Sequence, residues 1–272
     1  MTALRGPGRS ARRGAWAGLF LCCALAAVAR AEETPAANAG GTLTVFAASS
    51  LQEAFRALGT RFTAAGGTAV RFSFAGSQEL RAQLEQGAQA DLFASADLRH
   101  AEALQKSGLA GAPRSFAFNT LVIAVPKGNP ARVKSLDDLA RLEHLVVGAP
   151  EFPVGAYTEA LFARAEARTP GLAARLQKRI SSREPNVRQV LAKVALGEAD
   201  SGIVYRTDAR ALRDQVDAVE LAPELAPRTE AVIATLAHAA HREAAEAFVA
   251  FLLSREGQAE LAVQGFIPVA GP

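Results

Sequence analysis

The sequence predicts an α/β protein of two lobes, each a mainly parallel sheet covered by helices. Short apolar runs alternate with amphipathic segments along most of the chain, and no internal repeat or low-complexity tract interrupts them. Such alternation favours parallel strands, because a parallel connection needs a crossover that is usually a helix. The chain has 272 residues, of which 50% are hydrophobic and 21% charged. This length and composition suit a globular protein with room for two cores.

Residues 1–31 are interpreted as a cleavable signal peptide. Four arginines precede an apolar run over residues 15–28, and Ala29-Arg30-Ala31 has the small-x-small pattern of a cleavage site. The run is shorter than the roughly 20 residues that a membrane-spanning helix needs. Both cysteines lie inside it, so cleavage after Ala31 leaves no thiol. We expect residues 32–40 to form a flexible N-terminal tail.

The basic character of the chain belongs to this segment. It holds five arginines and no acid, which leaves 25 of the 30 basic residues against 27 acidic ones in the rest of the chain. A slightly acidic chain without a dense Lys/Arg run argues against a nucleic-acid partner.

The predicted elements follow the apolar periodicity in order. In the first part of the chain, strands are expected at residues 43–48, 70–74, 91–95 and 121–125, with helices beginning at Ser50, Ser77 and Asp97. In the second part, helices are expected near residues 135–141, 155–167 and 187–196, with strands at 145–149 and 202–205.

Two of these strands end in a small residue and a serine before a helix. Ser50 follows the first strand, and Ser77 follows the second. Carboxyl ends of parallel strands lie at one edge of a sheet, and helix N-termini there can hold an anion. Two ordinary helix caps would give the same pattern.

Six segments occur in the order and spacing of the periplasmic molybdate-binding proteins of ABC importers, which the chain resembles from about residue 41 to its C-terminus. They are Thr44-Val-Phe-Ala-Ala-Ser-Ser-Leu51, Phe74-Ala-Gly-Ser77, Ala90-Asp-Leu-Phe-Ala-Ser-Ala-Asp97, Pro150-Glu151, Asn186-Val-Arg188 and Gly202-Ile-Val-Tyr205-Arg-Thr-Asp-Ala209. The resemblance implies the two-lobed class II periplasmic binding protein fold, with the ligand in the cleft between the lobes.

The resemblance also implies the ligand-binding residues. Ser50 and Ser77 would contribute from the first lobe, and backbone N–H groups near Val154 and at Val187, with the Tyr205 hydroxyl, from the second. All five would be hydrogen-bond donors to the molybdate oxyanion rather than direct metal ligands. The loop over residues 150–157 is one residue shorter than the family pattern, which leaves Gly155 and Ala156 as alternatives to Val154.

Donors of this kind suit a tetrahedral dianion. Its oxygens are all acceptors at neutral pH, and serine hydroxyls, a tyrosine hydroxyl and amide N–H groups can satisfy them without a formal countercharge. Helix N-termini add partial positive charge. An anion that keeps a proton would set its O–H against another donor, so we expect such a site to disfavour it.

The resemblance implies the periplasmic substrate-binding component of an ABC importer, without a cofactor and not an enzyme, that delivers molybdate, and tungstate as well, to a membrane permease. We expect a monomer. The first lobe is expected over residues 41–122 and 232–272 and the second over 123–231, with crossings near 121–126 and 230–235.

Two alternatives remain. The same fold could serve another oxyanion, such as sulfate or phosphate. A secreted serine hydrolase is less favoured, because no histidine adjoins Ser50 or Ser77 in the sequence and no nucleophile-elbow or metal motif is present. Among the charged neighbours, Arg188 could support the anion or be solvated, and Asp91 and Asp97 are expected to brace their turns.

Overall fold

Ten strands form one hydrogen-bonded sheet in residues 41–269, the part of the chain that the computed structural model describes. The predicted signal peptide and tail lie outside the described residues. The strands are β1 (Leu43–Ala48), β2 (Val70–Ala75), β3 (Leu92–Ser95), β4 (Arg114–Pro126), β5 (Leu145–Gly148), β6 (Ile180–Glu184), β7 (Ser201–Tyr205), β8 (Val216–Glu220), β9 (Arg228–Thr235) and β10 (Ile267–Pro268). The helices are α1 (Gln52–Ala64), α2 (Ser77–Glu85), α3 (Leu98–Lys106), α4 (Pro153–Arg168), α5 (Leu172–Gln177), α6 (Val187–Ala195), α7 (Arg206–Ala211), α8 (Arg242–Leu253) and α9 (Arg255–Val263), with short 3-10 helices η1 (Ser49–Leu51) and η2 (Leu136–Arg141).

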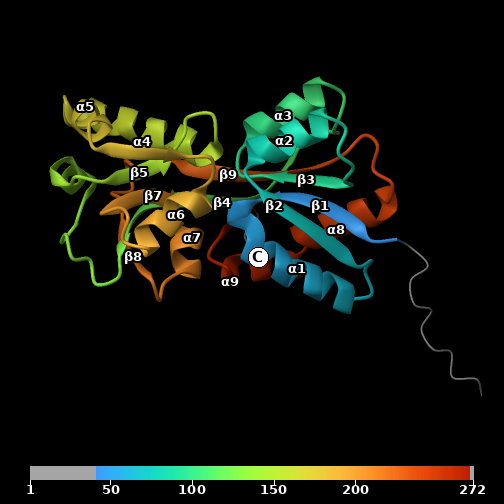
Figure 1. Cartoon of the computed structure of the whole chain (residues 1–272). Coiled ribbons are helices and arrows are strands. Elements are labelled where there is room, and N and C mark those ends of the chain that lie inside the picture. Colours follow the sequence, from blue (N-terminus) through green and yellow to red (C-terminus); the bar gives the residue numbers. More distant parts are fainter. Residues whose placement is uncertain (1–40, 270–272) are drawn as a thin grey trace, which may run out of the picture. The chain divides into compact units, whose positions relative to one another are not determined.

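The long strand β4 joins two groups of strands. Its residues 114–120 pair with β9, whereas residues 121–126 pair with β7 and β8. In the first group β1 lies parallel between β2 and β3, and in the second β5 lies parallel between β6 and β7. We call the part around β1 the first lobe and the part around β5 the second lobe (Figure 1). The predicted α/β fold with mainly parallel strands in each lobe is confirmed, and the antiparallel strands β4 and β9 lie between the two groups.

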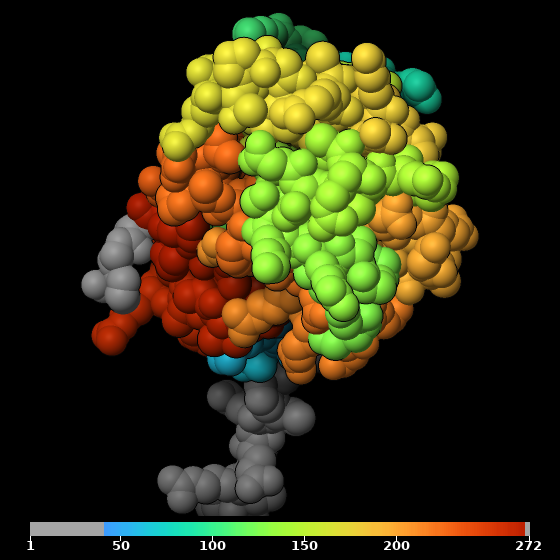
Figure 2. Space-filling model, turned by 90° about the vertical axis from the view of Figure 1, so that its left-hand side faces the viewer, coloured from blue at the N-terminus to red at the C-terminus, as the bar shows by residue number. Residues whose placement is uncertain are grey.

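Helices cover both faces of the sheet in each lobe. In the first lobe α2 and α3 lie on one face and α1, α8 and α9 on the other, while in the second lobe α4 and α5 lie opposite α6 and α7 (Figure 1). Figure 2 looks onto the second lobe, where α4 and α5 (yellow) and residues 127–144 (light green) form much of the visible surface.

A group of phenylalanines fixes α1 on the sheet of the first lobe. The ring of Phe55 packs edge-on against Phe116 of β4, with 5.5 Å between ring centroids, and is tilted against Phe248 of α8 at 6.1 Å. Removing a large buried aromatic side chain typically costs about 3–5 kcal/mol. This packing therefore holds the start of α1, and η1 before it, in a defined place at the end of β1.

Several elements differ from the sequence-based expectation: β4 begins at Arg114 rather than at residue 121, and α5, α7, β8, β9 and β10 were not predicted. The helix expected near residues 135–141 is present as the 3-10 helix η2 (Leu136–Arg141), and the Asp138 carboxylate accepts the N–H groups of Lys134 and Ser135 at its start. Strand β6 was not predicted, because Ser181, Ser182 and Arg183 make it polar at the edge of the sheet.

Candidate functional site

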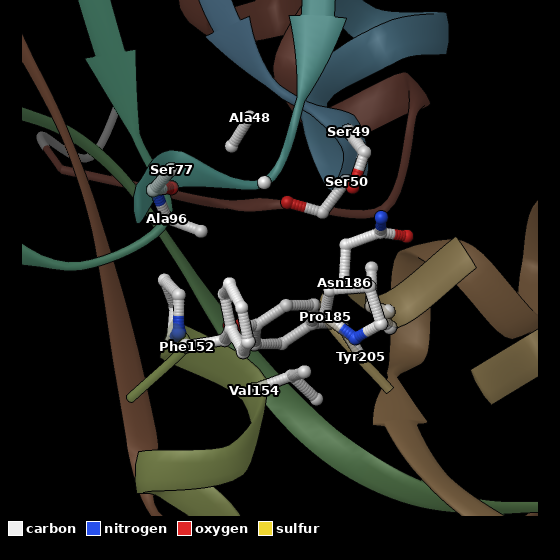
Figure 3. Close-up of a pocket in the computed structure, with 13 residues that line it drawn as sticks. Ala48, Ser49, Ser50, Ser77, Ala96, Phe152, Val154, Pro185, Asn186 and Tyr205 are labelled. Carbon is white, nitrogen blue, oxygen red and sulfur yellow. The ribbon is translucent and has the colours of Figure 1, made fainter. Parts of the chain in front are cut away.

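The five residues singled out in the sequence line the same pocket between the two lobes. Figure 3 shows the serines of the first lobe facing Phe152, Val154, Asn186 and Tyr205 of the second across this space. The pocket is lined by Ala48, Ser49, Ser50, Gly76, Ser77, Ala96, Phe152, Pro153, Val154, Pro185, Asn186, Val187 and Tyr205. Its cavity volume is about 20 Å³, far below the roughly 300–1,000 Å³ of pockets for drug-sized molecules. A small ion is the better match.

The first lobe presents two serines from neighbouring strand ends. Ala48 at the end of β1 pairs with Ala75 at the end of β2, so the turns that follow lie side by side. Ser50 lies in η1, and Ser77 is the first residue of α2. The Ser77 Oγ accepts the N–H of Ala96 at 3.1 Å. Since that bond uses only a lone pair, the hydroxyl hydrogen of Ser77 is left to donate into the pocket.

The start of α4 forms one part of the opposing wall. Two glycines let it approach the end of β5: a Cβ at Gly148 would lie 2.7 Å from the nitrogen of Gly155, and a Cβ at Gly155 would overlap the carbonyl of Ala149. Pro153 takes the first helical position, where a missing N–H costs nothing. Within residues 41–269, the N–H of Val154 next to it has no acceptor.

Helix α6 adds a second N-terminus to that wall. Its cap is Asn186, whose side-chain oxygen accepts the N–H of Gln189 at 3.1 Å. The capping bond leaves the N–H of Val187 at the first helical position, where no intrahelical acceptor exists. With η1, α2 and α4, four helix N-termini thus meet at the pocket.

Tyr205 closes the floor of the pocket. It ends β7 and is 2% exposed, and its hydroxyl has no hydrogen-bond partner in the described structure. An unsatisfied buried hydroxyl costs about 1–3 kcal/mol, so this one is expected to have a partner in the functional state. Burial raises the pKa of the Tyr205 hydroxyl well above its usual value, which keeps it a donor at neutral pH.

The lining carries no ionisable carboxylate, lysine, arginine or histidine among the described residues. The Asn186 oxygen, an acceptor, is already engaged by Gln189. What remains is a set of hydroxyl and amide donors beside helix N-termini. Chemically, this arrangement is suited to a small anion with several acceptor oxygens.

The charged neighbours have structural roles. Asp97 caps α3 by accepting the N–H of His100 and pairs with Arg99, and Asp91 accepts the N–H groups of Thr44 and His241. The expectation that Asp97 braces its turn is confirmed, whereas Asp91 joins β1 to the residue before α8. Arg188 is not freely solvated, since its guanidinium contacts two carboxylates.

Sequence reasoning missed several residues of the lining. Gly76, Ala96, Phe152 and Asn186 were not assigned to the site. Of these, Asn186 carried a signal, because an asparagine directly before a helical pattern is a typical N-cap. The others contribute mainly shape, which depends on how the two lobes face each other.

Metal binding and membrane spanning were also considered for the described residues. They contain no group of three or more His, Cys, Asp or Glu side chains placed to hold a metal ion. No helix among them combines the length and apolar character needed to span a membrane.

Comparisons with known proteins show the family of the chain by sequence and its fold by structure. Residues 43–267 match the family model described as bacterial extracellular solute-binding protein. The molybdate-binding protein ModA of Mycobacterium tuberculosis is 39% identical over 249 residues, covering 88% of this chain and 92% of that protein. The periplasmic molybdate-binding protein of Azotobacter vinelandii aligns with a TM-score of 0.71 at 23% identity, over 84% of this chain and 100% of that one. The sulfate-binding protein SubI of Mycobacterium tuberculosis aligns with a TM-score of 0.75 at 24% identity, over 85% and 88% of the two chains.

Proposed function

The chain belongs to the bacterial extracellular solute-binding protein family, and from this premise we propose that it is the periplasmic substrate-binding component of a molybdate ABC importer. It captures the oxyanion in the pocket between its lobes and delivers it to a membrane permease. Tungstate, which has the same shape and charge, is taken as well. The protein acts as a monomer and carries its ligand without a cofactor.

The observation that carries this proposal is the set of neutral donors around the pocket. The hydroxyls of Ser50, Ser77 and Tyr205 and the N–H groups of Val154 and Val187 surround one space. Each hydrogen bond to a charged group contributes about 1.5–3 kcal/mol, so such a set can offset the desolvation of a dianion and the cost of ordering two lobes.

Binding is expected to close the two lobes around the ligand. The ligand contacts Ser50 and Ser77 from one side and Val187 and Tyr205 from the other, so it stabilises the arrangement in which both sides are close. We place the lobe boundaries at residues 41–122 with 232–272, and 123–231. The change of partners of β4 between Thr120 and Leu121 supports the first boundary.

Sulfate is the second candidate ligand, because the fold matches a sulfate-binding protein as well as it matches a molybdate-binding one. Sequence identity favours molybdate, since the 39% identical relative binds it and the sulfate-binding protein is 24% identical. A serine hydrolase is disfavoured, because no histidine of the described chain lines the pocket to activate Ser50 or Ser77.

Isothermal titration of the chain without residues 1–31 tests the ligand. We expect one molybdate or tungstate per chain and far weaker binding of sulfate and phosphate. Sulfate is a fully deprotonated dianion and is separated from molybdate by cavity size, whereas phosphate keeps a proton at neutral pH that would face a donor. Sulfate binding as tight as molybdate binding would overturn the ligand assignment while leaving the fold intact. Ester hydrolysis that Ser50→Ala abolishes would support the hydrolase instead.

A further inference from the structure

Three charged side chains from both lobes meet beside the pocket. Arg188 of α6 donates from Nη2 to Glu53 of α1, and its Nε lies 2.8 Å from Oδ1 of Asp208 in α7. Glu53 belongs to the first lobe, and the other two belong to the second. In Figure 1 the start of α1 lies next to α6 and α7, where the two lobes meet.

Asp208 anchors the arginine within the second lobe. Its side chain is fully buried, and neither carboxylate oxygen has a well-aligned hydrogen bond in the described structure. Arg188 is the cation in contact with it, and the arginine side chain is 23% exposed. Since Nε of Arg188 lies 2.8 Å from this fully buried side chain, the contact with Asp208 restrains the position of the arginine.

From this position Arg188 reaches the other lobe. The Glu53 side chain is 40% exposed and lies in the first turn of α1, directly after η1 with Ser50. Arg188 follows Val187, which lines the pocket, in the first turn of α6. One turn of α6 therefore carries both a proposed ligand contact and the ion pair to the opposite lobe.

We propose that Arg188 is a positioning residue that couples ligand binding to closure of the lobes, with Asp208 as its anchor and Glu53 as its partner across the cleft. This rests on the proposed function for the identity of the ligand. Arg188 does not line the pocket, and its guanidinium contacts Glu53 and Asp208 instead, so it does not act as a countercharge for the anion. Its contribution is to the closed arrangement.

The test compares two glutamates. Glu53→Gln removes the partner across the cleft, whereas Glu220→Gln removes the partner of Arg206 within the second lobe, an exposed pair with 2.6 Å between its atoms. An exposed ion pair is worth about 0.2–1 kcal/mol, or about 1.4- to 5-fold in an equilibrium constant, and a half-buried one somewhat more. We expect Glu53→Gln to weaken molybdate binding about 3- to 10-fold and Glu220→Gln to leave it unchanged.

The distance between the two lobes can be measured without the ligand, and it reports closure directly. Spin labels on cysteines introduced at Lys106 in α3 and Lys178 after α5, both exposed, report the distance between the lobes. Glu53→Gln should shift the ligand-free distances towards longer values, and Glu220→Gln should not. Distance distributions of Glu53→Gln that match the parent with and without molybdate would overturn the proposal.

A double variant tests whether the effect of Glu53 depends on Arg188. Arg188→Gln alone leaves Asp208 buried and unpaired, so it is combined with Asp208→Asn. In that double variant Glu53 has no partner, and adding Glu53→Gln should change neither affinity nor lobe distance further. An equal effect of Glu53→Gln in both backgrounds would show that Glu53 acts without Arg188. Failure of the parent to bind molybdate would instead count against the proposed function. The ligand-free distances between the lobes would still show whether Glu53 and Arg188 hold the lobes together.

Discussion

The two walls of the pocket present their donors in different ways. The first lobe offers the side-chain hydroxyls of Ser50 and Ser77, whereas the second offers the helix N-termini at Val154 and Val187, joined by the Tyr205 hydroxyl. A hydroxyl donor is set by the residue type at one position. A backbone donor is set by where the helix begins and how closely it packs, so substitutions should act on the two walls through different positions.

The largest loss of molybdate affinity is expected at the start of α4, because the position of its backbone N–H groups depends on close packing against β5. Gly155→Ala adds a Cβ that overlaps the carbonyl of Ala149, so the start of α4 must move away from β5. Overpacking of this kind costs about 1–3 kcal/mol or more, and it displaces the N–H of Val154. We expect titration calorimetry to detect no molybdate binding.

Gly111→Ala is the matched control for that variant. The nearest atom to a Cβ at Gly111 is the carbonyl oxygen of Thr235 at 3.6 Å, an ordinary contact. Its affinity for molybdate should equal that of the parent. Parental affinity in Gly155→Ala as well would contradict the assignment of the α4 N-terminus to the site.

The next largest effect is expected for the hydroxyls. Ser50→Ala, Ser77→Ala and Tyr205→Phe each remove a donor to a buried dianion, which implies a loss of roughly 1.5–3 kcal/mol, or about 10- to 150-fold in affinity. Ser77→Ala also removes the acceptor for the N–H of Ala96. Thermal unfolding of each ligand-free variant therefore has to accompany the titrations, to separate lost binding from lost stability.

Two buried carboxylates give a comparison of a different kind. Burial would raise the pKa of Asp91 in the first lobe, but the N–H groups of Thr44 and His241 hydrogen-bond to it and hold its pKa below the usual value. Asp208 in the second lobe is fully buried, and this burial raises its pKa to about 7 despite the charge of Arg188.

The sign of the resulting pH dependence follows from the raised pKa. Between about pH 4 and pH 7 the folded chain holds a proton on Asp208 that the unfolded chain has lost, so the Asp208 contribution to the free energy of unfolding falls as pH rises. Urea unfolding at about pH 5 and about pH 7.5 should show a decrease on the order of 2 kcal/mol that Asp208→Asn removes. An unchanged pH dependence in Asp208→Asn would contradict the raised pKa.

The smallest effect is expected at Val187. Val187→Ala keeps the backbone N–H that the site would use, so affinity for molybdate should change less than about threefold. A loss as large as that of Ser50→Ala, without a fall in thermal stability, would show that the valine side chain rather than its N–H is recognised.

The same difference between the walls explains what the sequence could predict. Residue type and strand order predicted that Ser50 and Ser77 lie at one edge of the sheet, whereas Tyr205, Val154 and Val187 were assigned through the family resemblance. The position of Val154 depends on the contact between Gly148 and Gly155, two residues that are close only in the folded chain. The ion pair of Arg188 with Glu53 joins residues far apart in sequence and was equally hidden.

Crystals of the molybdate complex, measured at the molybdenum absorption edge, test the central claim most directly. The account predicts one anomalous peak between the lobes, with oxygens of the ion within hydrogen-bond distance of the Ser50, Ser77 and Tyr205 hydroxyls and of backbone N–H groups at the starts of α4 and α6. A peak outside this pocket, or one contacted from a single lobe, would contradict it.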